Sequence, residues 1–545
     1  METPASFEAR SGKSLCSELA KGVESSHTWP IDFTENIMQD KATRRQFLKF
    51  AGMSGAAFGV GNFAFLRGLP AVSAQEARVA PALVKLDAGI EPLVRLIEET
   101  PQADLLEQVA QRIHQGTTYQ EVVAALFLAG IRNVAPRPSV GFKFHAVMVV
   151  NAAHLESLAS PDSDRWLPIF WALDQFKNSQ AMEQHDSGWR MTPVNESIVP
   201  PPHKAREAFI EAMDSWDEKK ADAAVSGLVR SAGANQIYEL FYRYGARDFR
   251  SIGHKAIFVA HSWRMLQFIG WQHAEPVLRS LAFALLNHDL KNTTPALSDD
   301  PADRPWRRNQ KLAAGMGQSW MSGKLDDGAT REMLAVLRQG TNDDACDKAA
   351  ALMGRGVSPH SIWDALFVGA CEIVMRQPTV PNVHSMTSTN ALRYAFQSSA
   401  DEGTRKLLLL QNCAFIPMFR DAMRGKIADI RIDDVKPLAV KESSGAVEEI
   451  FSDLSKDRMI AAEKIHYYLS NGGTPQNLMN AARRLIFLKG TDAHDYKFSC
   501  AVLEDYFKVS PAWRDQFLAT SAFYLKGSGG KDNSVVQRTR AAMKL

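Results

Sequence analysis

The strongest constraint on the fold of this chain is one sequence unit that occurs four times. Each copy has a helical segment that ends near a glycine, a short capping sequence, an apolar helix, a loop, and a histidine that opens the next helix. A unit of this kind cannot bury its apolar face alone, so we expect the copies to stack around a common core. The histidines of the four copies are His145, His254, His384 and His494.

The start of each copy has a helix-stop signal followed by a helix-start signal. Glycine tolerates the left-handed backbone that closes many helices, and the predicted closing glycines are Gly116, Gly233, Gly356 and Gly473. Short polar side chains accept hydrogen bonds from the free amides of the next helix, and the predicted N-caps are Thr118, Asn235, Ser358 and Thr474. Glu121, three residues after Thr118, completes a capping box.

The spacing within the copies indicates how they arose. From the predicted cap to the histidine the distances are 27, 19, 26 and 20 residues, so long and short copies alternate. The first and third histidines are 239 residues apart, and the second and fourth are 240 apart. The simplest account is a two-unit ancestor that duplicated. A chain repeated in this way is expected to fold into two halves related by a pseudo-twofold axis.

The apolar residues follow a helical period almost everywhere. Spacings of three and four recur, as in Leu105, Leu106, Val109 and Ile113, and no alternating strand pattern stands out. We therefore predict an all-α protein with four helical repeats, with the stretch at 184–202 and the linker after residue 292 read as loops. The predicted segments are an N-terminal signal (1–74), a linker (75–90), a first half (91–292), a second linker (293–328), a second half (329–530) and a C-terminal tail (531–545).

The N-terminal segment has the order of an export signal. Thr43-Arg44-Arg45-Gln46-Phe47-Leu48-Lys49 precedes a weakly apolar stretch, and Val72-Ser73-Ala74 offers small residues for cleavage. This order closely resembles the twin-arginine (Tat) export signal. The resemblance implies that the Tat machinery exports the folded chain to the periplasm, a route typical of cofactor-loaded enzymes. The alternatives are a transmembrane helix and an uncleaved signal that tethers the protein.

Composition excludes some functions and leaves others open. The 63 basic and 61 acidic residues nearly cancel, so nothing suggests a nucleic-acid-binding surface. After Ala74 no apolar run reaches the ~20 residues needed to span a bilayer, which predicts a mature chain without a membrane span. Four of the five cysteines follow the signal without metal-site spacing, and their apolar surroundings favour buried thiols.

The four aligned histidines are the candidate metal ligands. Neutral imidazole binds Zn, Cu, Fe and Ni near pH 7, and a pseudo-twofold axis would bring His145, His254, His384 and His494 together in one site or in two sites of two. The predicted cofactor is a transition metal ion (Fe, Cu or Zn) or a haem held non-covalently by histidine. His261 lies seven residues after His254, on the same helix face, and is a further candidate for cofactor binding.

These residues favour an exported metalloprotein, with oxidoreductase activity on an unidentified small molecule as the leading hypothesis. A second hypothesis is a helical-repeat binding protein whose histidines only hold the loops before them. A third is a metal-dependent hydrolase that uses a bound water. No G-x-S-x-G, Walker, H-E-x-x-H, dinucleotide-binding or C-x-x-C-H motif is present. The segment from Gly116 to Leu126 faintly resembles the helical repeat of carboxymuconolactone decarboxylase-like proteins, but lacks their catalytic cysteine pair.

Overall fold

The computed structural model describes residues 83–137, 142–288, 295 and 299–544. The predicted signal (1–74) lies outside these residues. The described chain is all-helical, as predicted, and it has no β-strand beyond one isolated bridge between Lys324 and Val357. No helix within the described residues is long and apolar enough to cross a membrane.

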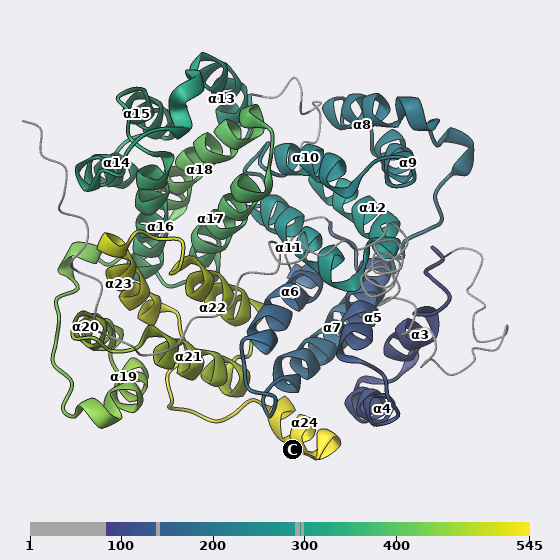
Figure 1. Cartoon of the computed structure of the whole chain (residues 1–545). Coiled ribbons are helices and arrows are strands. Elements are labelled where there is room, and N and C mark those ends of the chain that lie inside the picture. The colour runs from purple at the N-terminus through teal and green to yellow at the C-terminus, as the bar shows by residue number, and fades with distance from the viewer. Residues whose placement is uncertain (1–82, 138–141, 289–294, 296–298, 545) are drawn as a thin grey trace, which may run out of the picture. The chain divides into compact units, whose positions relative to one another are not determined.

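Most of the helices are joined by short connections, with longer ones before α8 and α19 (Figure 1). The first ten are α3 (Glu91–Glu99), α4 (Gln102–His114), α5 (Tyr119–Asn133), α6 (His145–Leu158), α7 (Trp166–Asp186), α8 (Ala205–Asp214), α9 (Glu218–Val229), α10 (Ala234–Gly245), α11 (His254–Ile269) and α12 (Ala274–Leu285). The next six are α13 (Arg304–Gly315), α14 (Asp327–Gln339), α15 (Asn342–Gly354), α16 (Pro359–Arg376), α17 (Val380–Ser398) and α18 (Glu402–Ala422). The last six are α19 (Ala446–Leu454), α20 (Arg458–Ser470), α21 (Pro475–Lys489), α22 (Ala493–Asp505), α23 (Pro511–Thr520) and α24 (Ser534–Met543).

Short 3₁₀ turns join several of these helices. They are η2 (Phe142–Phe144), η3 (Glu196–Ile198), η4 (Pro202–Lys204), η5 (Trp271–His273), η7 (Gln318–Met321), η8 (Ile432–Asp434), η9 (Ser443–Gly445) and η10 (Ser521–Phe523). The predicted loop at 184–202 is confirmed, apart from the last residues of α7 and the short 3₁₀ turns η3 and η4.

Several predicted caps are confirmed in the structure. Thr118 accepts a hydrogen bond from the amide of Glu121, and the Glu121 carboxylate accepts one from the amide of Thr118, so the capping box is present. Ser358 caps α16 by accepting from the amide of His360, and α16 begins with Pro359. Gly116 has the left-handed backbone predicted for it, with φ of +108°.

Two of the predicted capping positions are wrong by one or two residues. Gly233, not Asn235, is the N-cap of α10, because the helix begins at Ala234 and Gln236 accepts a hydrogen bond from the Gly233 amide. In the fourth copy the left-handed glycine is Gly472, with φ of +82°. Gly473 lies under the ring of Tyr468, where a Cβ atom would come within 2.4 Å of that ring.

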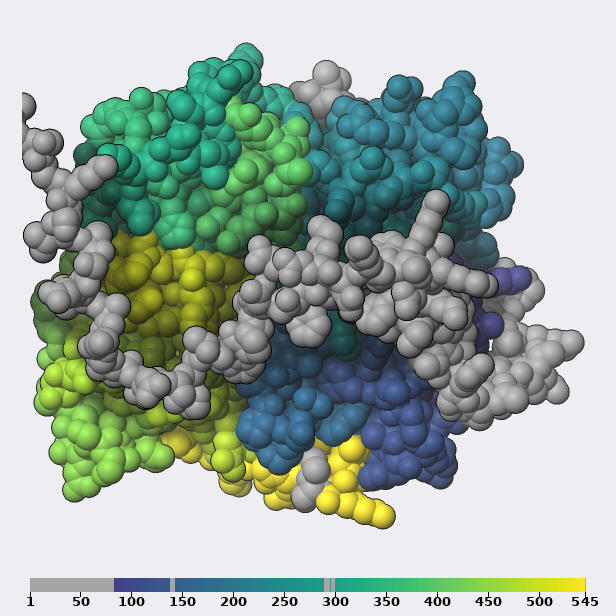
Figure 2. All heavy atoms as spheres, in the orientation of Figure 1, coloured from purple at the N-terminus to yellow at the C-terminus, as the bar shows by residue number. Residues whose placement is uncertain are grey.

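Two segments predicted to be loop or tail contain helices. The linker 293–328 includes α13, whose buried residues Trp306, Asn309 and Ala313 share one face and pack on α18. The tail 531–545 includes α24, which begins after the cap Asn533 and packs on α4 and α7. Figure 2 shows this last segment, in yellow, beside the blue atoms of the first helices. The sequence did not predict these two helices, because the segments are charged or rich in proline and only one narrow face of each helix is apolar.

The core is continuous through the described chain and is built from the apolar faces of these helices. Cys346, Cys371 and Cys413 are buried free thiols and Cys500 is a partly buried one, as the sequence predicts. The repeat symmetry inferred from the spacing remains a prediction. The structure does show that the four aligned histidines lie on central helices of the fold.

Candidate metal centre

The four histidines belong to four helices that form a closed ring of contacts. Helix α6 packs on α11, α11 on α17, α17 on α22, and α22 on α6 (Figure 1). His145 and His254 are the first residues of α6 and α11, His494 is the second residue of α22, and His384 lies in the second turn of α17. Each helix therefore directs one imidazole from near its N-terminus toward the same point.

The turn before α11 is built to bring its first residue close to α17. Gly253 has a φ of +85°, in the left-handed region, and Ile252 before it has a φ of +43°. A Cβ atom on Gly253 would lie 2.5 Å from the Cβ of Ser388, one turn after His384 on α17. Any side chain at position 253 would push the two helices apart. Glycine is therefore required here for both its backbone conformation and its size.

The start of α22 is fixed by its own capping residue. Asp492 is the N-cap of this helix, and one of its carboxylate oxygens accepts a hydrogen bond from the backbone amide of His494 at 2.7 Å. The same oxygen accepts a second hydrogen bond from Nδ1 of the His494 ring. One carboxylate thus sets both the beginning of the helix and the orientation of the imidazole.

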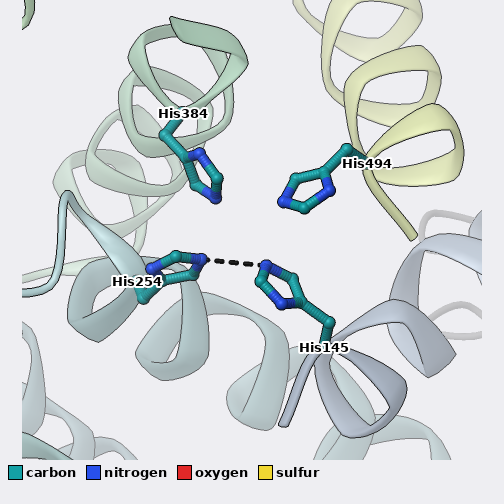
Figure 3. Close-up of side chains that lie close together, drawn as sticks. All are labelled: His145, His254, His384 and His494. Atoms are coloured by element: carbon teal, nitrogen blue, oxygen red, sulfur yellow. Dashed lines mark hydrogen bonds between the residues drawn. The ribbon is translucent and has the colours of Figure 1, made fainter. Parts of the chain in front are cut away.

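The four imidazole rings surround one small space (Figure 3). Going round the ring, the centroid distances are 4.9 Å from His145 to His254, 4.2 Å from His254 to His384, 4.9 Å from His384 to His494 and 4.4 Å from His494 to His145. The diagonal from His145 to His384 is 6.0 Å. Four short edges and a longer diagonal describe a puckered square rather than a regular tetrahedron, in which all six distances would be equal.

Backbone and carboxylate acceptors hold three of these rings by Nδ1. His254 Nδ1 lies 2.7 Å from the carbonyl of Ser251, and His384 Nδ1 lies 2.8 Å from the carbonyl of Val380. His494 Nδ1 faces Asp492. A carbonyl or carboxylate can only accept, so each Nδ1 carries the proton and each Nε2 keeps its lone pair for a metal ion.

The Nε2 atoms face one another across the centre of the group. His254 Nε2 lies 3.0 Å from His145 Nε2. The Nε2 atoms of His384 and His494 are buried and have no hydrogen-bond partner within the described residues. Buried polar nitrogens without a partner are uncommon in native proteins, because desolvation costs about 1–3 kcal/mol for each group. A metal ion bound by all four nitrogens would satisfy them together.

All four imidazoles are held neutral. Burial is the largest cause that lowers the pKa of each ring, and the positive charge of Lys497 lowers it further. For His494 the adjacent Asp492 carboxylate opposes this effect but does not reverse it. Neutral imidazole is the form that ligates a metal, so protons compete weakly for these ligands at neutral pH.

The Asp492 carboxylate remains charged. Burial would raise its pKa, but hydrogen bonds from His494 and the charge of Lys497 lower it to about 2. An ionised carboxylate on Nδ1 increases the basicity of the imidazole and fixes its orientation, as in the carboxylate–histidine–metal arrangement of many metal sites. The site therefore has a carboxylate positioned behind one of its four candidate ligands.

Lys497 is the member of this site that the sequence reasoning missed. It lies one turn after His494 on α22, only 2% of it is exposed, and its Nζ has no hydrogen-bond partner within the described residues. Burial lowers its pKa to about 7. The spacing of three residues from His494 places the two side chains on neighbouring positions of one helix face, which was the only signal available in the sequence.

Further along three of these four helices, polar and charged side chains form hydrogen bonds between the helices. Arg264 of α11 donates to Glu504 of α22 at 2.9 Å, and Asn390 of α17 donates to Glu504 and to Asp505 at 2.9 and 2.8 Å. These contacts link α11, α17 and α22 at positions six to eleven residues after the histidines. They fix the relative positions of the helices and so the geometry of the four rings.

His261 does not join the four-histidine group. Its Nδ1 lies 2.9 Å from the carbonyl of Met148 on α6, and burial lowers its pKa to about 3. His154 is a buried residue of α6 whose Nδ1 lies 3.1 Å from the hydroxyl of Tyr119. The structure therefore brings together His145, His254, His384 and His494, and neither His261 nor His154 belongs to this group.

The size of the group fits a single metal ion. One ligating atom from each histidine lies within 4.8 Å of the other three. With metal–nitrogen bonds of about 2.0–2.1 Å, opposite nitrogens of a square site would be about 4 Å apart and adjacent ones about 3 Å. Ring shifts of roughly a few tenths of an ångström would complete such a site. A haem iron would use at most two of the four histidines, because it takes four bonds from the porphyrin.

Comparison with known proteins gives no assignment. No protein-family model, no curated protein and no solved structure matches the chain. The chemistry of the site therefore has to be argued from its geometry.

Proposed function

We propose that this chain is an exported metalloprotein in which His145, His254, His384 and His494 bind one redox-active transition metal ion and support an oxidoreductase reaction. The observation that carries the proposal is the convergence of four buried, neutral imidazoles from four helices on one point. Separate loop-fixing roles for these histidines would not require their Nε2 atoms to face one another.

The donor set indicates which metals to test. Four neutral nitrogen donors suit copper, nickel, zinc and iron, whereas magnesium and calcium require oxygen ligands. The puckered square of rings resembles the tetragonal geometry of copper(II) and nickel(II) more than the tetrahedral geometry of structural zinc. A metal ion held by four imidazoles could also take a further ligand, such as a substrate. For this reason we favour a catalytic or redox role over a purely structural one.

Metal analysis of the purified protein tests the proposal. We expect about one transition metal ion per chain by mass spectrometry, and a loss of most of it when any one of the four histidines is changed to alanine. His261→Ala is the matched control, since His261 is a partly buried histidine of the same helix as His254 and lies outside the four-histidine group. A metal-free wild type that also fails to take up copper, zinc, nickel or iron would refute the proposal, as would unchanged metal content in all four variants.

A visible absorption and electron paramagnetic resonance spectrum separates the redox hypothesis from the hydrolase alternative. A copper or iron centre that changes its spectrum on treatment with dithionite supports electron transfer. A colourless zinc centre that is inert to reductant would instead favour hydrolysis by a metal-bound water.

Export by the Tat route is a separate part of the proposal, carried by Arg44 and Arg45. Folded export would allow the metal to be inserted before the protein leaves the cytoplasm. Replacing both arginines with lysine should leave the precursor inside the cell, which fractionation and immunoblotting would detect. Unchanged periplasmic accumulation of the double variant would refute this route.

A further inference from the structure

A buried ammonium group, that of Lys497, lies one turn after His494 and makes no hydrogen bond to an acidic side chain within the described residues. Lys497 Nζ has no hydrogen-bond partner within the described residues, although an ammonium group can donate three hydrogen bonds. Most buried lysines of this chain are paired: Lys255 donates to Asp248 at 2.7 Å, and Lys464 donates to Glu449 and Asp453. The difference indicates that Lys497 serves something other than a structural ion pair.

The position of Lys497 directs its side chain toward the histidines. Side chains on a helix lean toward the helix N-terminus, and Lys497 is three residues after His494 in a helix whose N-terminal end carries that ligand. The side chain is only 2% exposed, and its buried Nζ has no hydrogen-bond partner within the described residues. Lys497 is therefore a buried cationic side chain one turn away from a candidate metal ligand.

The other charges around this space are also mainly positive. Helices α6 and α11 begin at His145 and His254, and α22 begins one residue before His494, so three helix N-termini with their partial positive charges face the site. Asp492 balances the charge of Lys497 but is engaged by the ring and the amide of His494. A divalent metal held by four neutral imidazoles would leave about two positive charges uncompensated.

We propose that the four-histidine centre, when it holds its metal ion, binds a small anion that the ion would attract and that accepts a hydrogen bond from the Lys497 ammonium group. This inference rests on the proposed metal site and names its ligand class: a monoanion of one to three heavy atoms. The burial of His254, His384, His494 and Lys497 restricts the size of the anion. His145, the least buried of the four histidines, marks the side from which the anion enters.

Azide binding to the metal-loaded protein tests this inference. The measurement is isothermal titration calorimetry with sodium azide, together with the absorption spectrum when the metal is coloured. The variants are Lys497→Met, which removes the charge and keeps a long side chain, and Lys497→Arg, which restores the charge. Lys219→Met, an exposed lysine of α9, controls for the change in net charge. Metal content is measured for every variant before azide is added.

We expect the Lys497→Met variant to keep its metal and to bind azide about 10- to 100-fold more weakly, the effect of losing one charge-assisted hydrogen bond. Lys497→Arg should recover at least part of the affinity, and Lys219→Met should match the wild type. If Lys497→Met does not fold, Lys497→Gln, which keeps a neutral donor, should show an intermediate loss.

Two results would overturn the inference, and they are distinguishable from each other. A wild type that holds its metal but does not bind azide, or whose azide affinity is unchanged in the Lys497→Met and Lys497→Gln variants, removes the anion site and leaves the metal site intact. A wild type that cannot be loaded with metal removes the proposed function and the anion site together.

Discussion

The unpaired Lys497 makes a prediction about stability that does not depend on metal binding. Burial lowers the pKa of its ammonium group from the ordinary value of 10.5 to about 7. Since one pKa unit corresponds to 1.36 kcal/mol, the folded state loses about 5 kcal/mol at neutral pH by holding this charge. Changing Lys497 to methionine removes the charge and keeps most of the packing volume. The metal-free variant should therefore be more stable than the wild type, by up to about 5 kcal/mol.

The sign of the pH dependence follows from the direction of the pKa shift. Between pH 7 and 10.5 the unfolded chain still binds the Lys497 proton while the folded chain has released it, so wild-type stability rises with pH by about 1.4 kcal/mol per unit from this group. Above pH 10.5 neither state holds the proton and the penalty is gone. The advantage of Lys497→Met should therefore be largest at or below pH 7 and should fall below about 1 kcal/mol near pH 10.5.

Urea unfolding of the chelated proteins, followed by circular dichroism at pH 7 and pH 10.5, measures this difference. Lys219→Met is the control, since an exposed lysine should give nearly the same free energy of unfolding as the wild type at both pH values. The reasoning is wrong if Lys497→Met is less stable than the wild type at pH 7. It is also wrong if the difference between the two proteins is the same at both pH values, because a charge penalty must titrate.

Four further predictions concern the metal centre. Removing the metal with a chelator should lower the melting temperature, since a ligand at 100 to 1,000 times its Kd stabilises the folded state by about 2.7–4.1 kcal/mol. If the ion were adventitious, differential scanning calorimetry would show no change in the melting temperature. Asp492→Asn should weaken metal affinity about 10- to 100-fold in a competition titration, because the His494 ring loses its carboxylate partner; equal affinity would exclude the carboxylate from tuning the site. The free energy of unfolding of the metal-free protein should fall as the pH falls below 6.5, because the unfolded chain takes up protons that the folded chain excludes. The fall should be at most about 1.4 kcal/mol per pH unit for each buried histidine. His384→Leu should reduce this dependence of stability on pH, and an unchanged dependence would contradict the lowered pKa. Gly253→Ala should reduce both metal content and stability, because the added Cβ would press on Ser388 and alanine would be strained at the left-handed φ of this position. A fully metallated and equally stable variant would show that metal binding does not need the close approach of α11 and α17.

The prediction of an all-α chain is confirmed because the helical period depends on residues that are close together in the sequence. Capping residues such as Thr118 and Ser358 and the apolar faces that follow them act within a few residues of one another, so sequence alone places most helix starts. The errors at Gly233 and Gly473 arose where two neighbouring residues could each serve as the boundary. Helix α13 was not predicted because its narrow apolar face is buried by packing on α18, which lies about 100 residues further along the chain.

The sequence by itself determined which four histidines to consider, because repetition is visible along the chain. It did not decide whether they form one site or two, and it suggested His261 as a further member. Only the tertiary structure decided these points, since the closed ring of α6, α11, α17 and α22 joins residues up to 349 positions apart. The unpaired state of Lys497 was equally invisible in the sequence. The sequence alone suggests a surface charge for a lysine on a helix, and only the packing of neighbouring helices shows that Lys497 is buried without a hydrogen-bond partner.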